Sequence, residues 1–105
     1  MIKAPDFLPL GSIISLEGNP KKMMVVGRAL VIQNEGREEY CDYGLCLYPE
    51  GMLGDVSIYS NHENIETVHA RGFADAEDEA VRGAITAALA ELEVPKAHPE
   101  PLESW

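Results

Sequence analysis

Basic side chains are scarce in this sequence. Lysine and arginine together number 8 among 105 residues, against 18 aspartate and glutamate residues, so the formal net charge is −10. A surface this acidic repels phosphate backbones and anionic lipid headgroups. The one small cluster of positive charge, Lys21 and Lys22, is too weak to reverse that repulsion. We therefore expect no nucleic acid and no membrane surface as partner, and a basic or neutral protein fits the charge better.

Long apolar runs and a secretion signal are also missing. No stretch approaches the roughly 20 apolar residues that a helix needs to span a bilayer. The first residues, MIKAPDFLPLG, contain one lysine and no apolar run of the length found in the central part of a signal peptide. These features predict a cytoplasmic protein, although export by a route without a cleaved signal stays open.

Motifs for catalysis or metal binding are few. No serine stands in a G-x-S-x-G pattern, and His62, His69 and His98 show neither H-x-x-x-H nor H-x-H spacing. The acidic run 75–79 lacks the alternating oxygen ligands and central glycine of a calcium loop. We therefore predict no catalytic residue, no metal site, no cofactor and no enzymatic activity. The enzymatic alternative is a small hydrolase using His62 and Glu63, and it predicts a concave pocket around His62.

The two cysteines lie in the stretch YCDYGLCLYPEG. Cys41 and Cys46 are five residues apart, so on one strand they face opposite sides and cannot pair with each other or share a metal ion. No base or positive charge in this acidic stretch lowers a thiol pKa. Both are predicted to be reduced, buried and structural. The three tyrosines of this stretch are predicted to pack at the core edge, with Asp42 accepting a hydroxyl bond, and an exposed aromatic patch is the alternative.

Alternating and continuous apolar patterns predict five strands, over residues 12–17, 23–32, 40–48, 56–60 and 65–70. The segment 23–32 is apolar throughout, which predicts that both of its faces are covered. Gly27 in its middle predicts a bulge or a close backbone approach. Arg28 must reach water or find a partner, and Asp42 and Glu50 are the candidates.

The hydrophobic period changes to that of a helix at Asp75. Apolar residues then recur on one face of a helix over 75–93, with Asp75 as the N-cap, acidic residues in the first turn and Pro95 beyond the end. Together the patterns predict one α+β domain over 1–105. It consists of an irregular arm (1–9), a twisted antiparallel meander of about five strands (10–73), a helix packed on one face (75–93) and an extended tail (94–105). Leu102 and Trp105 in the tail either dock on a groove or stay free.

Several of these segments occur in a distinctive order. LPLGSIISLEG, KKMMVVGR, YCDYGLCLYPEG and YSNHENIETVHARGF follow one another and lead into an acidic helix start. The pattern resembles a family of small bacterial proteins known as domain of unknown function 4176, over roughly residues 8–78. Ser60 departs from the pattern, which has an aromatic residue there. The positions that match the family motif are Gly11, Gly27, Arg28, Tyr43, Pro49, Glu50, Gly51, Asn61 and His62.

The resemblance implies a role, whereas the residue patterns alone predict only a small soluble domain. The family is similar to accessory proteins encoded beside type VII secretion systems of Gram-positive bacteria, near toxins with a helical export region. This implies a non-enzymatic, cytosolic, chaperone-like binding module whose partner is that export region. The alternatives are an immunity protein that neutralises a neighbouring toxin, or an uncharacterised protein with no defined activity. The resemblance brings no catalytic residues and no cofactor.

Overall fold

The computed structural model describes residues 1–54 and 58–99, and within them it has α+β architecture. This confirms the predicted fold class. Leu102, Trp105 and the first two residues of the predicted fourth strand lie outside the described residues. The strands are β1 (Ile13–Leu16), β2 (Asn19–Asn34), β3 (Arg37–Leu47), β4 (Ile58–Ser60) and β5 (Ile65–Ala70), and the helices are the 3-10 turn η1 (His62–Asn64) and the α-helix α1 (Ala76–Glu91).

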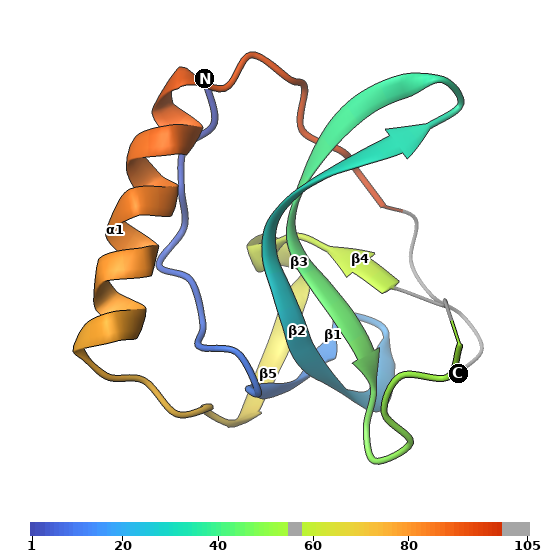
Figure 1. Cartoon of the computed structure of the whole chain (residues 1–105). Helices are drawn as coiled ribbons and strands as arrows, with labels where there is room; N and C mark the ends of the chain where they lie inside the picture. The colour runs from blue at the N-terminus through green and yellow to red at the C-terminus, as the bar shows by residue number, and fades with distance from the viewer. Residues whose placement is uncertain (55–57, 100–105) are drawn as a thin grey trace.

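The strands form one antiparallel sheet in the order β4-β3-β2-β1-β5 (Figure 1). The first four are sequential neighbours, as in a meander, whereas β5 returns to pair with β1 at the opposite edge. In a flat sheet the two edge strands would stand roughly 19 Å apart, at about 4.8 Å per strand. Residues 61–64 alone connect β4 to β5, and they include the compact turn η1. The sheet must therefore curl, so that its two edge strands approach each other.

The long strand β2 bends at two places. Its register against β3 shifts between Val25 and Gly27, and Ala29 has a positive φ of 55°. This confirms the bulge that Gly27 predicted. Gly27 pairs with Gly44, and the side chain of Leu30 lies over both glycines. The two missing side chains thus leave the space that Leu30 fills.

The strand with both faces covered is β3, not β2. All residues from 40 to 46 are buried, whereas Val26 and Val31 on β2 are 41% and 45% exposed. The prediction that both faces of 23–32 are covered was therefore wrong. For Val31 the reason is that the outer part of the β2–β3 hairpin projects away from the body (Figure 1), whereas Val26 lies at the bulge between Val25 and Gly27.

The N-terminal arm lies between α1 and the sheet (Figure 1). Phe7 and Leu8 are buried, and the Phe7 ring meets the Tyr43 ring edge-on at 5.7 Å between centroids. The Ile2 amide donates to the carbonyl oxygen of Leu89 at 3.0 Å. Leu89 is also the residue of α1 whose side chain is buried. The helix therefore covers one side of the sheet through the arm. The predicted N-cap is confirmed, because the Asp75 side chain accepts a hydrogen bond from the Asp78 amide.

Candidate functional site

The positions that match the family motif do not form one site. Gly11 and Gly51 have positive φ values of 85° and 80° in turns, which glycine adopts without strain. Pro49 and Glu50 lie in the same turn as Gly51, whose amide donates to Leu47 at 2.7 Å. These residues shape the backbone rather than gathering functional groups.

Arg28 pairs with the helix and not with its predicted partners. Its guanidinium lies 2.9 Å from the Asp78 carboxylate, and both side chains are largely buried. Glu50 instead pairs with Lys21 at 2.8 Å. Burial alone would raise the pKa of Asp78, but the hydrogen bond and charge of Arg28, with help from Arg82, hold that pKa below its usual value. The predicted pairing with Asp42 or Glu50 was wrong because the pattern could not show that the first turns of α1 bring Asp78 to Arg28.

A polar cluster surrounds the fully buried Asp42, and we call its members Tyr40, Asp42, Asn61, His62 and Lys96 the Asp42 cluster. The carboxylate accepts the Tyr40 hydroxyl at 2.8 Å and the His62 amide at 2.9 Å. The Lys96 ammonium group lies 3.6 Å away. The Asn61 side-chain oxygen accepts the Asp42 amide at 3.0 Å. The predicted tyrosine bond to Asp42 is thereby confirmed, and the cluster joins β3, η1 and the C-terminal segment.

Burial controls the acidity of the neighbouring groups. Desolvation, followed by the hydrogen bond to Asp42, strongly raises the pKa of Tyr40. Desolvation likewise raises the pKa of Tyr43 to about 12, and that of Cys41 to about 11 with the Asp42 charge as a second cause. Cys41 is therefore a protonated thiol at neutral pH, not a nucleophile. Cys41 and Cys46 are both free and buried, which agrees with their predicted structural role.

His62 has a structural hydrogen bond. The Tyr43 hydroxyl accepts the Leu8 amide at 2.9 Å and also forms a hydrogen bond with Nδ1 of His62, 2.8 Å away. Asn61 precedes η1, and its backbone amide donates to the Asn64 side-chain oxygen at 3.0 Å while its carbonyl oxygen accepts the Asn64 amide at 3.0 Å. These bonds fix the arm, β3 and η1 relative to one another.

The remaining candidate ligands do not converge. His69 lies on β5, with Nε2 3.2 Å from the Ser15 hydroxyl, and Glu63 pairs with Lys96 at 3.0 Å. Within residues 1–54 and 58–99, no three His, Cys, Asp or Glu side chains are placed to hold a metal ion. The absence of a metal and of catalysis both stay predictions.

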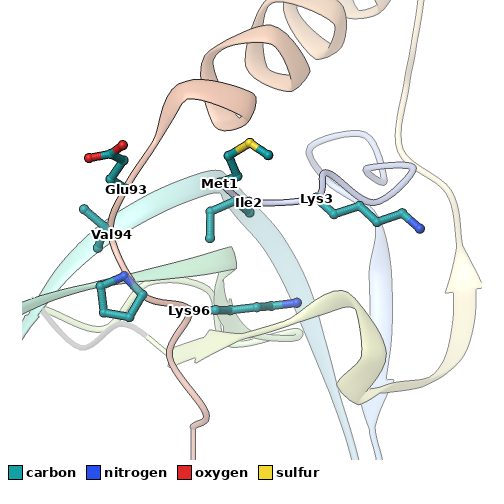
Figure 2. Close-up of a pocket in the computed structure, with 7 residues that line it drawn as sticks. Met1, Ile2, Lys3, Glu93, Val94 and Lys96 are labelled. Carbon is teal, nitrogen blue, oxygen red and sulfur yellow. The ribbon is translucent and has the colours of Figure 1, made fainter.

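A groove of about 510 Å³ runs between the N-terminus and the segment after α1 (Figure 2). Its walls are Met1 to Lys3 on one side and Glu93 to Lys96 on the other. His62 is not among its lining residues, so this groove is not the pocket that a His62 hydrolase requires. Its importance is that it leaves one side of the C-terminal segment without close packing.

A second feature is an exposed apolar surface formed by Leu10 and Phe73, which we call the Phe73 surface. Phe73 is 82% exposed in the loop between β5 and α1. Its neighbour Gly72 passes so close to Leu10 that even a Cβ atom would overlap the Leu10 carbonyl oxygen. The sequence patterns did not predict this surface. The feature that could have indicated it is Phe73, a single aromatic residue between a strand and an acidic helix start.

Comparison with known proteins gives one family. A family model described as Domain of unknown function (DUF4176) matches residues 7–81, more than half of the chain. No curated protein and no solved structure matches the chain. In the part of the chain that the structure describes, no helix is both long enough and apolar enough to cross a membrane. The family match includes the Phe73 surface and all of the Asp42 cluster except Lys96.

Proposed function

We propose that this chain, which belongs to the family called Domain of unknown function (DUF4176), is a binding module that escorts another protein without turnover. Its partner in this proposal is the helical export region of a toxin encoded beside it and secreted by a type VII system. The link to secretion comes from the resemblance described above. The binding role has structural support of its own, and the Phe73 surface carries it.

Phe73 is unusual because phenylalanine side chains are among those most often buried. Here the side chain is almost wholly exposed, next to the exposed Leu10 and within a loop that Gly72 holds against the β1 side of the molecule. The Gly72 amide also donates to the Ser12 hydroxyl at 3.0 Å. An exposed aromatic on a fixed backbone is well suited to binding, because little conformational freedom is lost when it is covered.

The charges beside this surface define the partner's chemistry. Glu77 and Glu79 are exposed in the first turn of α1, directly after the Phe73 loop. An amphipathic helix with an apolar stripe flanked by lysine or arginine would satisfy both features, and helices commonly bind apolar surfaces in this way. The charges would speed association more than they would strengthen the complex.

The test is co-expression with the neighbouring toxin divided into its export region and its active domain. We expect the export region to co-purify with wild type and with Val31→Glu, and to be lost with Phe73→Glu. Val31 is the matched control, because it is an exposed apolar residue on the projecting β2–β3 hairpin. Retention by the active domain alone, with loss of toxicity, would favour an immunity protein. Binding to neither half would refute the proposal.

A further inference from the structure

The segment that follows α1 occupies the outer edge of β3. On this edge β4 pairs only with residues 43–45, and Lys96 forms a parallel bridge with Tyr40 beyond it. The Tyr40 amide donates to the Pro95 carbonyl at 2.8 Å, and the Ala97 amide donates to the Tyr40 carbonyl at 2.7 Å. Both backbone groups of Tyr40 thus bind the segment as an added strand.

Side chains at the start of η1 bind the same segment. The Asn61 amide group donates to the Ala97 carbonyl at 2.8 Å while its oxygen is held by the Asp42 amide. Ala97 is buried, so only a small side chain fits at this position. We call the sites provided by Tyr40, Asp42, Asn61 and Glu63 the β3-edge slot.

The slot also selects charge. The Lys96 ammonium group lies 3.0 Å from the Glu63 carboxylate and 3.6 Å from that of the buried Asp42. A basic residue is therefore matched to two carboxylates, directly before the small residue. The slot reads an extended segment with a basic residue followed by a small one.

The segment and the slot differ in their relation to the family match and in how closely they are packed. All four slot residues lie inside the family match at 7–81, whereas residues 94–97 lie outside it. On its other side the segment borders the groove of about 510 Å³, and Pro95 is exposed (Figure 2). The segment is held by backbone bonds, by one charged side chain and by two small apolar contacts, the buried Ala97 and the half-buried Val94, and a competing strand of similar sequence can reproduce all of them.

We propose that the β3-edge slot is a peptide-docking site of this domain, occupied in cis by residues 94–97. Its external ligand is an extended segment of a partner protein with a lysine or arginine followed by a small residue. The chain's own segment competes with that ligand. The apparent dissociation constant of the ligand is therefore its intrinsic value divided by the fraction of molecules in which the slot is open. This site is separate from the Phe73 surface and does not depend on the proposed helical partner.

The test uses the full chain with Lys96→Glu and Ala97→Arg, which places a like charge and a large side chain in the slot. The probe is a fluorescent peptide with the sequence of residues 93–99, Glu-Val-Pro-Lys-Ala-His-Pro. We expect the double variant to bind this peptide at least about tenfold more tightly than wild type does. We also expect the double variant to bind a second peptide, with glutamate in place of lysine, at least about tenfold more weakly than it binds the first. Glu93→Gln, an exposed change in the same tail, is the matched control and should behave as wild type.

Equal binding by wild type and the double variant, or equal binding of the two peptides, would overturn the proposal. Because the double variant could fail to fold, a second test measures amide hydrogen exchange in the wild-type protein. Amide exchange at Tyr40 and Ala97 should be at least about tenfold faster than at Val25, whose amide is bonded to Ser12 inside the sheet. Exchange of all three at one common rate would show that the segment opens only with the whole domain, and would likewise refute a displaceable segment.

Discussion

Gly72→Ala is the sharpest test of the way in which the β5–α1 loop is fixed. An ideal Cβ atom on Gly72 would overlap the Leu10 carbonyl oxygen and would lie 3.0 Å from both the Leu10 carbonyl carbon and the Ser12 amide nitrogen. These are backbone atoms, so no side chain can rotate away to make room. The two backbone segments must separate.

The cost has two parts. Forcing backbone apart in a packed region costs about 1–3 kcal/mol. The same movement weakens the bond from the Gly72 amide to the Ser12 hydroxyl, which is 3.0 Å long and contributes about 1 kcal/mol. The free energy of unfolding should therefore fall by about 2–4 kcal/mol. For a domain of this size that lowers the melting temperature by roughly 10–25 °C.

The assay is thermal and urea denaturation of Gly72→Ala beside Gly83→Ala. Gly83 is exposed on α1, and a Cβ atom there meets nothing within 4 Å, so alanine should stabilise the helix by about 0.5–1 kcal/mol. The same chemical change is thus expected to have opposite signs at two sites. A melting temperature for Gly72→Ala within about 2 °C of wild type would show that the crossing is loose and would refute the reasoning.

Four further predictions use simpler measurements. Because the folded-state pKa of Asp78 is lowered, its contribution is present above its unfolded pKa of about 4 and is lost as the pH falls. Urea melts should therefore show that wild type loses more stability between pH 7 and about pH 3 than Asp78→Asn does, and equal losses would contradict the pairing. Thiol titration should find Cys41 and Cys46 free but slow to react until denaturant is added, and an intramolecular disulfide would contradict this. Gly27→Val should cost about 1–3 kcal/mol, because a Cβ atom there already touches Leu30 at 3.5 Å and valine adds two methyl groups; an unchanged urea midpoint would show that Leu30 adapts. Dialysis against a chelator should leave the melting temperature unchanged, and a loss of several degrees that zinc restores would reveal a metal site.

Local patterns predicted the elements well, because each element carries its own signal. The N-cap at Asp75 follows from an acidic residue placed directly before a helical period. The strand boundaries were less accurate: β2 extends over Asn19–Asn34, whereas the apolar run predicted 23–32. The extra residues have low strand propensity, but they pair across the hairpins. Pairing with β1 and β3 overrides their intrinsic preference.

Contacts distant in sequence were not predictable from these patterns. Periodicity identifies which side of a strand is apolar but not what covers it. For this reason both β1 and β5 were recognised as strands, but their pairing with each other was not predicted. The Asp42 cluster joins β3, η1 and a segment beyond α1, and no spacing rule links these three parts of the chain. The sequence patterns treated the members of this cluster separately, so they did not predict the β3-edge slot.

The position of α1 depends on a polar contact as much as on apolar burial. Leu89 is the one buried side chain of this helix and Ile85 packs against the core half-buried, so their burial contributes only about 2–4 kcal/mol. Apolar contact of that size does not strongly fix how far the helix slides or turns along the arm. The largely buried pair of Arg28 and Asp78 does, because any displacement leaves an unpaired charge away from water. Arg28 on β2 therefore fixes the first turns of α1, which follow directly on the Phe73 loop.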